Sequence, residues 1–295
     1  RADYAEWYYV HRALGINAQS QTLVTHLRKV AEAAYASGQS PQQDVLQAEV
    51  ELVRLENQGL KLGRLQRTVG AKIDALQDLP PETEVPTPAG LSVETPLQPE
   101  AALQKLALTH HPLLKSLDAR VSASQGGVDL AHQGYYPKLK LTAGYNSLWP
   151  VQSKRLTVGV AVNIPFGGNH RGEVGEADAR LQESKAKLAD ARDQLLSDID
   201  QSYATAQQAA ATIQLYRTKL LPLAKLSLQA AEADYSSGSG DFLKLITAEQ
   251  EDLQARLELA RARADFYTQL ASLNYQTGGA LWPSLVPATR REATP

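Results

Sequence analysis

The sequence lacks several residue types on which particular functions depend. Its 295 residues include no cysteine and no methionine, and only three phenylalanines and three tryptophans. Without cysteine the chain has no disulfide, no thiolate zinc site and no cysteine nucleophile. It also has no run of about 18 apolar residues, which excludes a transmembrane helix. The net charge is −2 and no Lys/Arg-rich run is present, so we expect no nucleic-acid partner.

Alanine, leucine, glutamine and glutamate dominate the sequence instead. This composition is typical of long helices that pack through small side chains. We therefore expect a mainly α fold.

One segment of the sequence occurs twice, 200 residues apart. The stretch AEAAYASG at 31–38 returns as AEADYSSG at 231–238, and nine of the 23 positions in 31–53 are identical to their partners in 231–253. Each copy predicts a helix, a short Gly/Ser turn and a second helix. A duplicated helical hairpin indicates two equivalent units related by pseudo-symmetry, which is typical of an assembly and not of a catalytic cleft.

Prolines, glycines and capping residues divide the chain into segments. Ser40 is expected as a helix N-cap with Pro41 in the first helical position, and a very long helix is expected after residue 172, interrupted at most near Pro222. We expect six segments: a first-repeat helical hairpin (1–77), a Pro-rich linker (78–99), short helices leading to the strands (100–134), a β-hairpin (135–166), a second-repeat long helical hairpin (167–278) and an irregular tail (279–295).

Two segments alternate polar and apolar residues with a period of two. They predict an antiparallel hairpin of strands 138–149 and 155–164 around a turn at 150–153. Each strand has about ten residues, the length of a tilted strand in a membrane barrel. A soluble amphipathic hairpin is the alternative. If the hairpin enters a membrane, the lipid-facing residues are expected to be Leu141, Ala143, Val158, Val160 and Val162.

The order of these features resembles one known family. Two strands, a very long helix and the closing stretch YSSGSGDFLKLITAEQEDLQARLELARARADFYTQLASLNYQTG at 235–278 are similar to the outer-membrane factor family, the TolC-like efflux ducts. The stretches HPLL at 111–114, YPKL at 136–139 and NIPFGG at 163–168 also resemble that family's entry into and exit from its second strand pair. No single motif is specific, whereas their order and spacing together with the duplication are. The repeats are most similar to the heavy-metal and cation branch.

The resemblance implies a passive exit duct of a tripartite efflux pump. Its subunit would be part of a homotrimer, with strands in a shared membrane β-barrel and helical hairpins in a periplasmic α-barrel. The implied partners are a periplasmic adaptor (membrane fusion) protein, an inner-membrane transporter and outer-membrane lipid, with most of the chain in the periplasm. The first strand pair and first long helix of the family are missing before Arg1. Either the chain is a fragment, or it cannot build the normal membrane pore.

The turns of the two repeats resemble the helical tips that close the periplasmic entrance in this family. The resemblance makes Asp44, Asp241, Lys244 and Thr247 candidates for the pore constriction, although Lys244 and Thr247 stand where acidic residues are often found. Asp44 and Asp241 are alternatively explained as residues that cap a helix or compensate its dipole. The turn glycines, Gly38 and Gly238, are expected to have positive φ.

Catalytic and ligand-binding residues are not indicated. His110 and His111 are adjacent but lack a third ligand, so we expect a solvated loop there and not a metal site. No Ser/His/Asp arrangement has a suggestive spacing, and no cofactor is expected. An enzyme is therefore not predicted. The alternative function is a soluble periplasmic coiled-coil or adaptor-type scaffold without channel activity, although the lipoyl-like half-motifs and extra strands of an adaptor are absent.

Overall fold

The computed structural model describes residues 1–80, 83–91, 97–145, 156–164 and 170–281. They divide into two compact units. The first comprises Arg1–Leu103 and Asp198–Pro295, and the second comprises Gln104–Ser197. The fold is mainly helical, as the composition predicts, and it contains one small antiparallel hairpin of strands, as the period-two alternation predicts. None of the described helices combines the length and the apolar character needed to cross a membrane.

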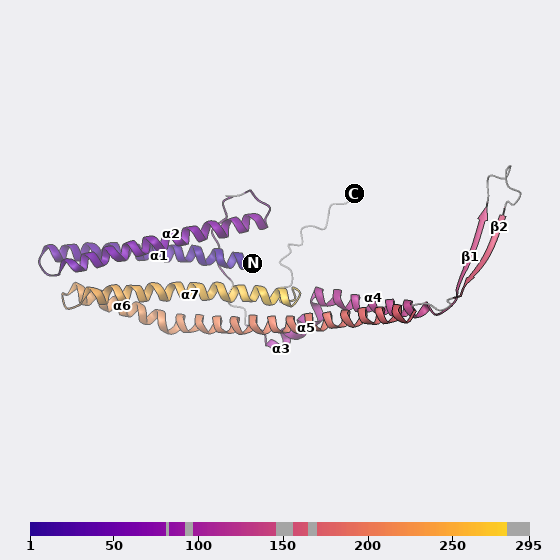
Figure 1. Cartoon of the computed structure of the whole chain (residues 1–295). Helices are drawn as coiled ribbons and strands as arrows, with labels where there is room; N and C mark the ends of the chain where they lie inside the picture. Colours follow the sequence, from indigo (N-terminus) through magenta and orange to yellow (C-terminus); the bar gives the residue numbers. More distant parts are fainter. Residues whose placement is uncertain (81–82, 92–96, 146–155, 165–169, 282–295) are drawn as a thin grey trace, which may run out of the picture. The chain divides into compact units, whose positions relative to one another are not determined.

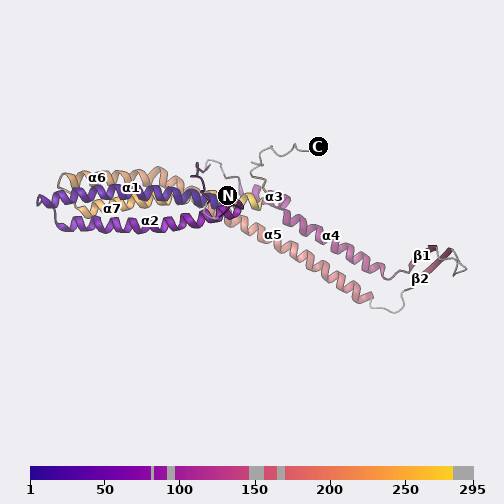
Figure 2. The same cartoon turned by 90° about the horizontal axis from the view of Figure 1, so that it is seen from above.

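Two antiparallel helical hairpins form the first unit (Figures 1 and 2). The first hairpin consists of α1 (Ala2–Ala36) and α2 (Gln42–Leu76). The second consists of α6 (Leu221–Ser236) and α7 (Phe242–Gln276), preceded by the end of α5 (His170–Leu215). Helix α7 packs along α1. Ser40 does not cap α2 as expected, because the helix begins one residue later with Pro41 at the N-cap and no side-chain capping bond.

The core of the first unit uses small side chains, as the composition suggests. Ala13, Ala31 and Ala48 are fully buried, and they lie beside larger residues such as Leu55 and Phe242. Alanine allows two helices to approach closely, so that backbone and side-chain atoms fill the interface. The sequence therefore holds two long hairpins together without many large apolar residues.

The long helix that leads into the second hairpin contains one turn of π-helix, Tyr216–Leu220. Pro222 lies just beyond it, at the start of α6. Because proline has no N–H to donate to the carbonyl four residues earlier, the regular ladder cannot continue through this position. The interruption expected near Pro222 is thus present as a π-helical turn, and the chain stays helical on both sides.

The second unit contains part of α3 (Glu100–His110), then α4 (Pro112–Gln133), two strands and the first part of α5. Helices α4 and α5 lie side by side in this unit, where the Ser124 and Ser184 hydroxyl oxygens are 2.8 Å apart (Figures 1 and 2). Tyr135 follows α4 and packs on His170 at the start of α5, with ring centroids 5.5 Å apart. These contacts join α4 and the residues that follow it to α5.

Strands β1 (Lys138–Tyr145) and β2 (Leu156–Asn163) pair antiparallel, as predicted. The register places Leu141 opposite Val160 and Ala143 opposite Val158. Directly opposite residues share a face of a sheet, so the five residues expected to face lipid are all on one face. Every strand residue is exposed except Gly159, which is half-buried. The turn expected at 150–153 and Trp149 lie outside the described residues.

Candidate functional site at the paired helical tips

The turns that close the two hairpins have the same backbone structure. In the first, the Gly38 N–H donates to the Tyr35 carbonyl at 3.0 Å and the Gln39 N–H to the Ala34 carbonyl at 2.8 Å. In the second, the Gly238 N–H donates to the Tyr235 carbonyl at 3.0 Å and the Ser239 N–H to the Asp234 carbonyl at 3.0 Å. Every donor and acceptor is displaced by 200 residues. The two segments predicted to be equivalent are therefore equivalent helical hairpins.

Glycine is required in both turns by backbone conformation. The φ angles are 72° at Gly38 and 76° at Gly238, in the left-handed region, as predicted. A Cβ atom at either position would meet no atom within 4 Å, so space is not the reason. Residues with a side chain are strained at such angles, whereas glycine is not. Both helices consequently end in a left-handed C-terminal cap.

Space makes glycine necessary at a third position, Gly240, which sequence reasoning missed. A Cβ there would lie 2.7 Å from the backbone nitrogen of Tyr235. The equivalent residue of the first turn is Ser40. The sequence does indicate that the two turns differ at this position, because only the second copy has a glycine there.

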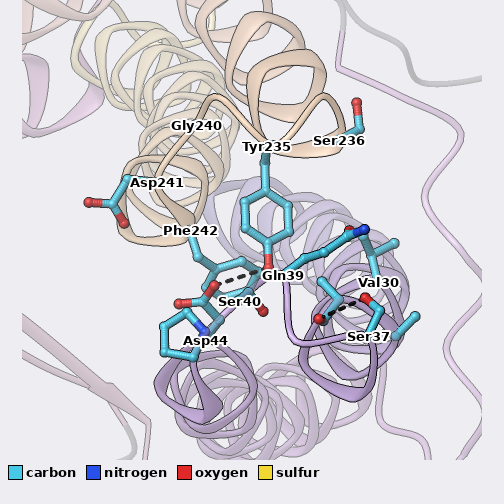
Figure 3. A pocket seen from close by; sticks show the side chains of 14 residues that line it. Val30, Ser37, Gln39, Ser40, Asp44, Tyr235, Ser236, Gly240, Asp241 and Phe242 are labelled. Atoms are coloured by element: carbon cyan, nitrogen blue, oxygen red, sulfur yellow. Dashed lines mark hydrogen bonds between the residues drawn. The ribbon is translucent and has the colours of Figure 1, made fainter.

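The tips of the two hairpins are joined by a hydrogen bond from Tyr235 to Asp44 (Figure 3). The Tyr235 hydroxyl donates to Asp44 Oδ2 at 3.1 Å, and the Tyr235 ring packs edge-on against Phe242 with centroids 5.1 Å apart. Asp44 is largely buried in the first turn of α2. Burial raises the pKa of the Tyr235 phenol; a hydrogen bond with Ser40 opposes this rise and the hydrogen bond to Asp44 adds to it, so the hydroxyl keeps its proton at neutral pH.

The other candidate residues of the second tip are exposed to solvent. Asp241 is the N-cap of α7, and its Oδ1 accepts from the Leu243 N–H at 2.9 Å. The Thr247 hydroxyl donates to the Leu243 carbonyl at 2.8 Å, one turn earlier in its own helix. Lys244 stands at the position equivalent to Asp44. The equivalent of the Tyr235–Asp44 pair is thus Tyr35 and Lys244, and both are exposed.

A hollow of about 450 Å³ lies between the two tips (Figure 3). Both turns line it, with Ser37 and Gln39 from the first and Ser236 and Gly240 from the second. No titratable residue other than Asp44, Tyr235 and Asp241 lines it, and among the described residues no group of three His, Cys, Asp or Glu side chains could hold a metal ion. These contacts hold two helical ends against each other and offer no nucleophile–base pair.

The solvated loop expected at the adjacent histidines is wrong, because His110 ends helix α3 and His111 is buried. His110 Nδ1 lies 2.7 Å from the Thr109 hydroxyl and 3.1 Å from the Leu106 carbonyl, so this nitrogen is turned back onto its own helix. His111 is buried at the junction before α4.

The repeat also continues to the other end of the hairpins, which sequence reasoning missed. Helices α2 and α7 end 200 residues apart, and Asp78 has a φ of 55° where Gly278 has 68°. The Asp78 N–H donates to the Ala75 carbonyl and the Gly278 N–H to the Tyr275 carbonyl. The match is hidden in the sequence because aspartate replaces glycine, and both residues tolerate the left-handed region better than most.

Comparisons with known proteins agree with this arrangement. The structure resembles the outer membrane protein VceC from Vibrio cholerae (TM-score 0.80, 21% identity, covering 94% of this chain and 68% of that one). It also resembles CusC (TM-score 0.80, 18% identity, covering 94% of this chain and 67% of that one). A third similar structure is the open state of the MtrE outer membrane channel from Neisseria gonorrhoeae (TM-score 0.72, 18% identity, covering 95% of this chain and 66% of that one). The chain thus spans about two thirds of their length, and the likeness establishes the fold.

A comparison with curated proteins gave no match. Residues 103–279, more than half of the chain, match the family described as outer membrane efflux protein. The order of strands, long helices and paired tips is the one that the sequence resemblance implied. The chain belongs to the outer membrane efflux protein family.

Proposed function

We propose that this chain is a subunit of an outer-membrane efflux channel that conducts passively. It would act as the exit duct of a tripartite pump, with a periplasmic adaptor and an inner-membrane transporter supplying the other two parts. Family membership and the two equivalent helical hairpins support this function. At the described tips, the hydrogen bond from Tyr235 to Asp44 holds the ends of the two hairpins against each other.

The observation that carries the proposal is the exposed apolar face of the strand hairpin. Leu139, Leu141, Val158, Val160 and Val162 are all more than half exposed. A two-stranded ribbon is marginal alone, and its unpaired edges and apolar face need a cover. A closed barrel in lipid covers both, because neighbouring strands pair the edges and acyl chains contact the apolar face.

Spin labels on the hairpin of the protein reconstituted in lipid vesicles test this assignment. Labels at Leu141 and Val160 should contact lipid, whereas labels at Thr142 and Thr157 should contact water. Thr142 and Thr157 are matched controls, because they lie on the same two strands as Leu141 and Val160 but on the opposite face. Water contact at all four positions would contradict insertion and favour the periplasmic scaffold alternative. Conductance steps in planar bilayers provide the complementary functional measurement, and we expect them from a protein that also carries the family's first strand pair and first long helix.

A homotrimer is supported by unequal burial of equivalent helices. In α7, Ile246, Leu253 and Ala260 are buried in the core. Their equivalents in α2, Leu46, Val53 and Leu60, are 51%, 64% and 75% exposed. A row of exposed apolar residues on a helix surface indicates a contact with another protein chain.

The second hairpin has the matching groove. A hollow of about 580 Å³ between α6 and α7 is lined by Leu220, Leu223, Ala224, Ser227 and Ala255, among others. Their equivalents in the first hairpin, Ser20, Leu23, Val24, Leu27 and Leu55, are buried or pack against the core that contains α7. Helix α2 of a second copy would fill the open groove of the second hairpin, in the same way that α7 covers the equivalent face of the first hairpin. Repetition of that head-to-tail contact closes a ring, which the family resemblance implies has three copies.

A further inference from the structure

A layer of polar side chains crosses the core of the first unit where α1, α2 and α7 meet. Asn17, Ser20, Glu51 and Glu249 are each 4% exposed or less. Glu249 lies roughly two helical turns beyond the tip at which α7 begins. Buried carboxylates are costly unless hydrogen bonds or cations compensate the charge. The partners of Glu249 therefore decide whether it holds a proton.

Glu51 has partners that suit a carboxylate. Its Oε2 accepts from Gln250 Nε2 at 2.5 Å and from Arg54 Nη1 at 3.3 Å. These donors stabilise the negative charge of Glu51.

Glu249 has fewer compensating partners. The Ser20 hydroxyl of α1 forms a hydrogen bond with its carboxyl group. Its Oε2 is buried without a hydrogen-bond partner. An ionised carboxylate in this position would leave an oxygen both charged and desolvated, whereas a protonated carboxyl group would not carry that charge.

Helices α1, α2 and α6 pack against α7, and the charged groups that act on Glu249 lie on α2 and on α7 itself. Glu51 faces it from α2, and Asp252 and Arg256 face it from α7 itself, while α1 supplies the neutral Ser20. Arg256 forms an ion pair with Asp252 at 3.6 Å and donates a hydrogen bond to Gln19 of α1. Arg54 forms an ion pair with Glu51. Burial first, and the charges of Glu51 and Asp252 next, raise the pKa of Glu249 from 4.5 to about 7.

The internal repeat supplies a natural comparison. Glu49 is the equivalent of Glu249, and it is the same residue type on the equivalent helix. Glu49 is exposed, because α2 lies at the margin of the unit where α7 lies inside it. The special surroundings of Glu249 thus arise from packing between the two hairpins and not from its local sequence.

We propose that Glu249 is a protonation switch that sets how tightly the second hairpin docks against the first. With a proton on Glu249, α7 packs closely against α1 and α2. Loss of the proton places a second negative charge beside Glu51 in the same interface, and the repulsion and desolvation loosen the packing near the tips. The switch concerns contacts within one chain and does not depend on whether the chain conducts.

The absence of cysteine permits a direct test with two introduced labels. Gln39 and Ser239 are exposed residues of the two turns, and Cys at both positions would carry spin labels for distance measurement by electron resonance. In the otherwise unchanged chain, the distance distribution should lengthen or broaden as pH rises through about 7. Glu249→Gln keeps the shape of the side chain without its charge, so the distance between the two labels in this variant should stay short at every pH. Glu49→Gln is the matched control and should respond like the unchanged chain.

The outcomes separate the switch from other titrations. A response that persists in Glu249→Gln would overturn the proposal and assign the effect to another group. No response in the unchanged chain would also overturn it. Nuclear magnetic resonance of the labelled Glu249 carboxyl carbon gives an independent readout that needs no substitution at this site. A midpoint near 7 agrees with the proposal, and one near 4.5 contradicts it.

Discussion

At the scale of single residues, the turn glycines and the buried glutamate are the positions at which a single substitution should change stability most clearly. Gly38 and Gly238 have open space around them, so their role is confined to backbone conformation. Glu249 is the opposite case, because its backbone is ordinary helix and its surroundings determine its chemistry. Substitutions at these positions should therefore act through different terms of the folding free energy.

Gly238→Ala should destabilise the chain by about 1–2 kcal/mol, because an L-residue in the left-handed region bears that strain. Ser237→Ala is the matched control in the same turn. The Ser237 hydroxyl donates to the Asp234 carbonyl at an exposed site, so its loss should cost within about 0.5 kcal/mol. Urea unfolding of both variants measures the difference, and equal free energies would be inconsistent with the cap.

The stability of the chain should fall as pH rises between the two pKa values of Glu249. Below about 4.5 the folded and unfolded chains both hold the proton; between about 4.5 and about 7 only the folded chain keeps it. The folded state then binds more protons, so the free energy of unfolding decreases with pH until the folded chain also loses the proton. The loss contributed by Glu249 is on the order of 3 kcal/mol.

Glu249→Gln should remove this part of the pH dependence and be more stable than the unchanged chain above the midpoint. Urea unfolding at a series of pH values from about 4.5 to about 7, with Glu49→Gln as control, measures it. An unchanged slope in Glu249→Gln would show that other groups cause the dependence.

At the scale of elements, close approach of α1 and α2 depends on a small residue at one position. Asn17 Nδ2 donates to the Leu55 carbonyl at 3.1 Å, and a Cβ at Gly59 would lie 3.3 Å from Asn17 Oδ1. A Cβ at Gly63, one turn later on α2, would meet no atom within 4 Å. The two glycines share a helix and differ only in what faces them.

Gly63→Ala should stabilise the chain by about 0.5–1 kcal/mol, because glycine in a helix interior is unfavourable relative to alanine. Gly59→Ala should gain less, and Gly59→Leu should destabilise the hairpin by pushing Asn17 off the Leu55 carbonyl. Thermal unfolding of the three variants gives the order directly. A gain at Gly59 as large as that at Gly63 would contradict the close approach.

The elements themselves were largely predictable from the sequence, because local signals define them. Glycine in the left-handed region ends α1 and α6, and strict alternation marks the strands. Local signals did not place the N-cap of α2, where Pro41 took the position expected for Ser40. The bond between Tyr235 and Asp44 joins residues 191 apart in sequence, and its equivalent pair is Tyr35 and Lys244. The repeat alone could therefore not have indicated this hydrogen bond. It could not have indicated the burial of Glu249 either.

At the scale of the whole molecule, the internal repeat relates contacts within a chain to contacts between copies. Ile246 and Leu23 belong to one cluster in the core of a single chain. Their equivalents, Leu46 and Leu223, are 51% and 63% exposed. If three copies close a ring by repeating the internal contact, Leu46 of one copy lies near Leu223 of the next.

Cysteines introduced at Leu46 and Leu223 should therefore cross-link between copies, and the chain offers no native cysteine to interfere. Oxidation of the protein reconstituted in lipid should give covalent dimers and trimers on a denaturing gel, with trimer as the largest major species. Leu46→Cys combined with Tyr275→Cys is the control, because Tyr275 is at least as exposed as Leu223 but lies at the far end of α7. Cross-linking within single chains only, or equal cross-linking of the control pair, would contradict the ring in which α2 fills the groove of its neighbour.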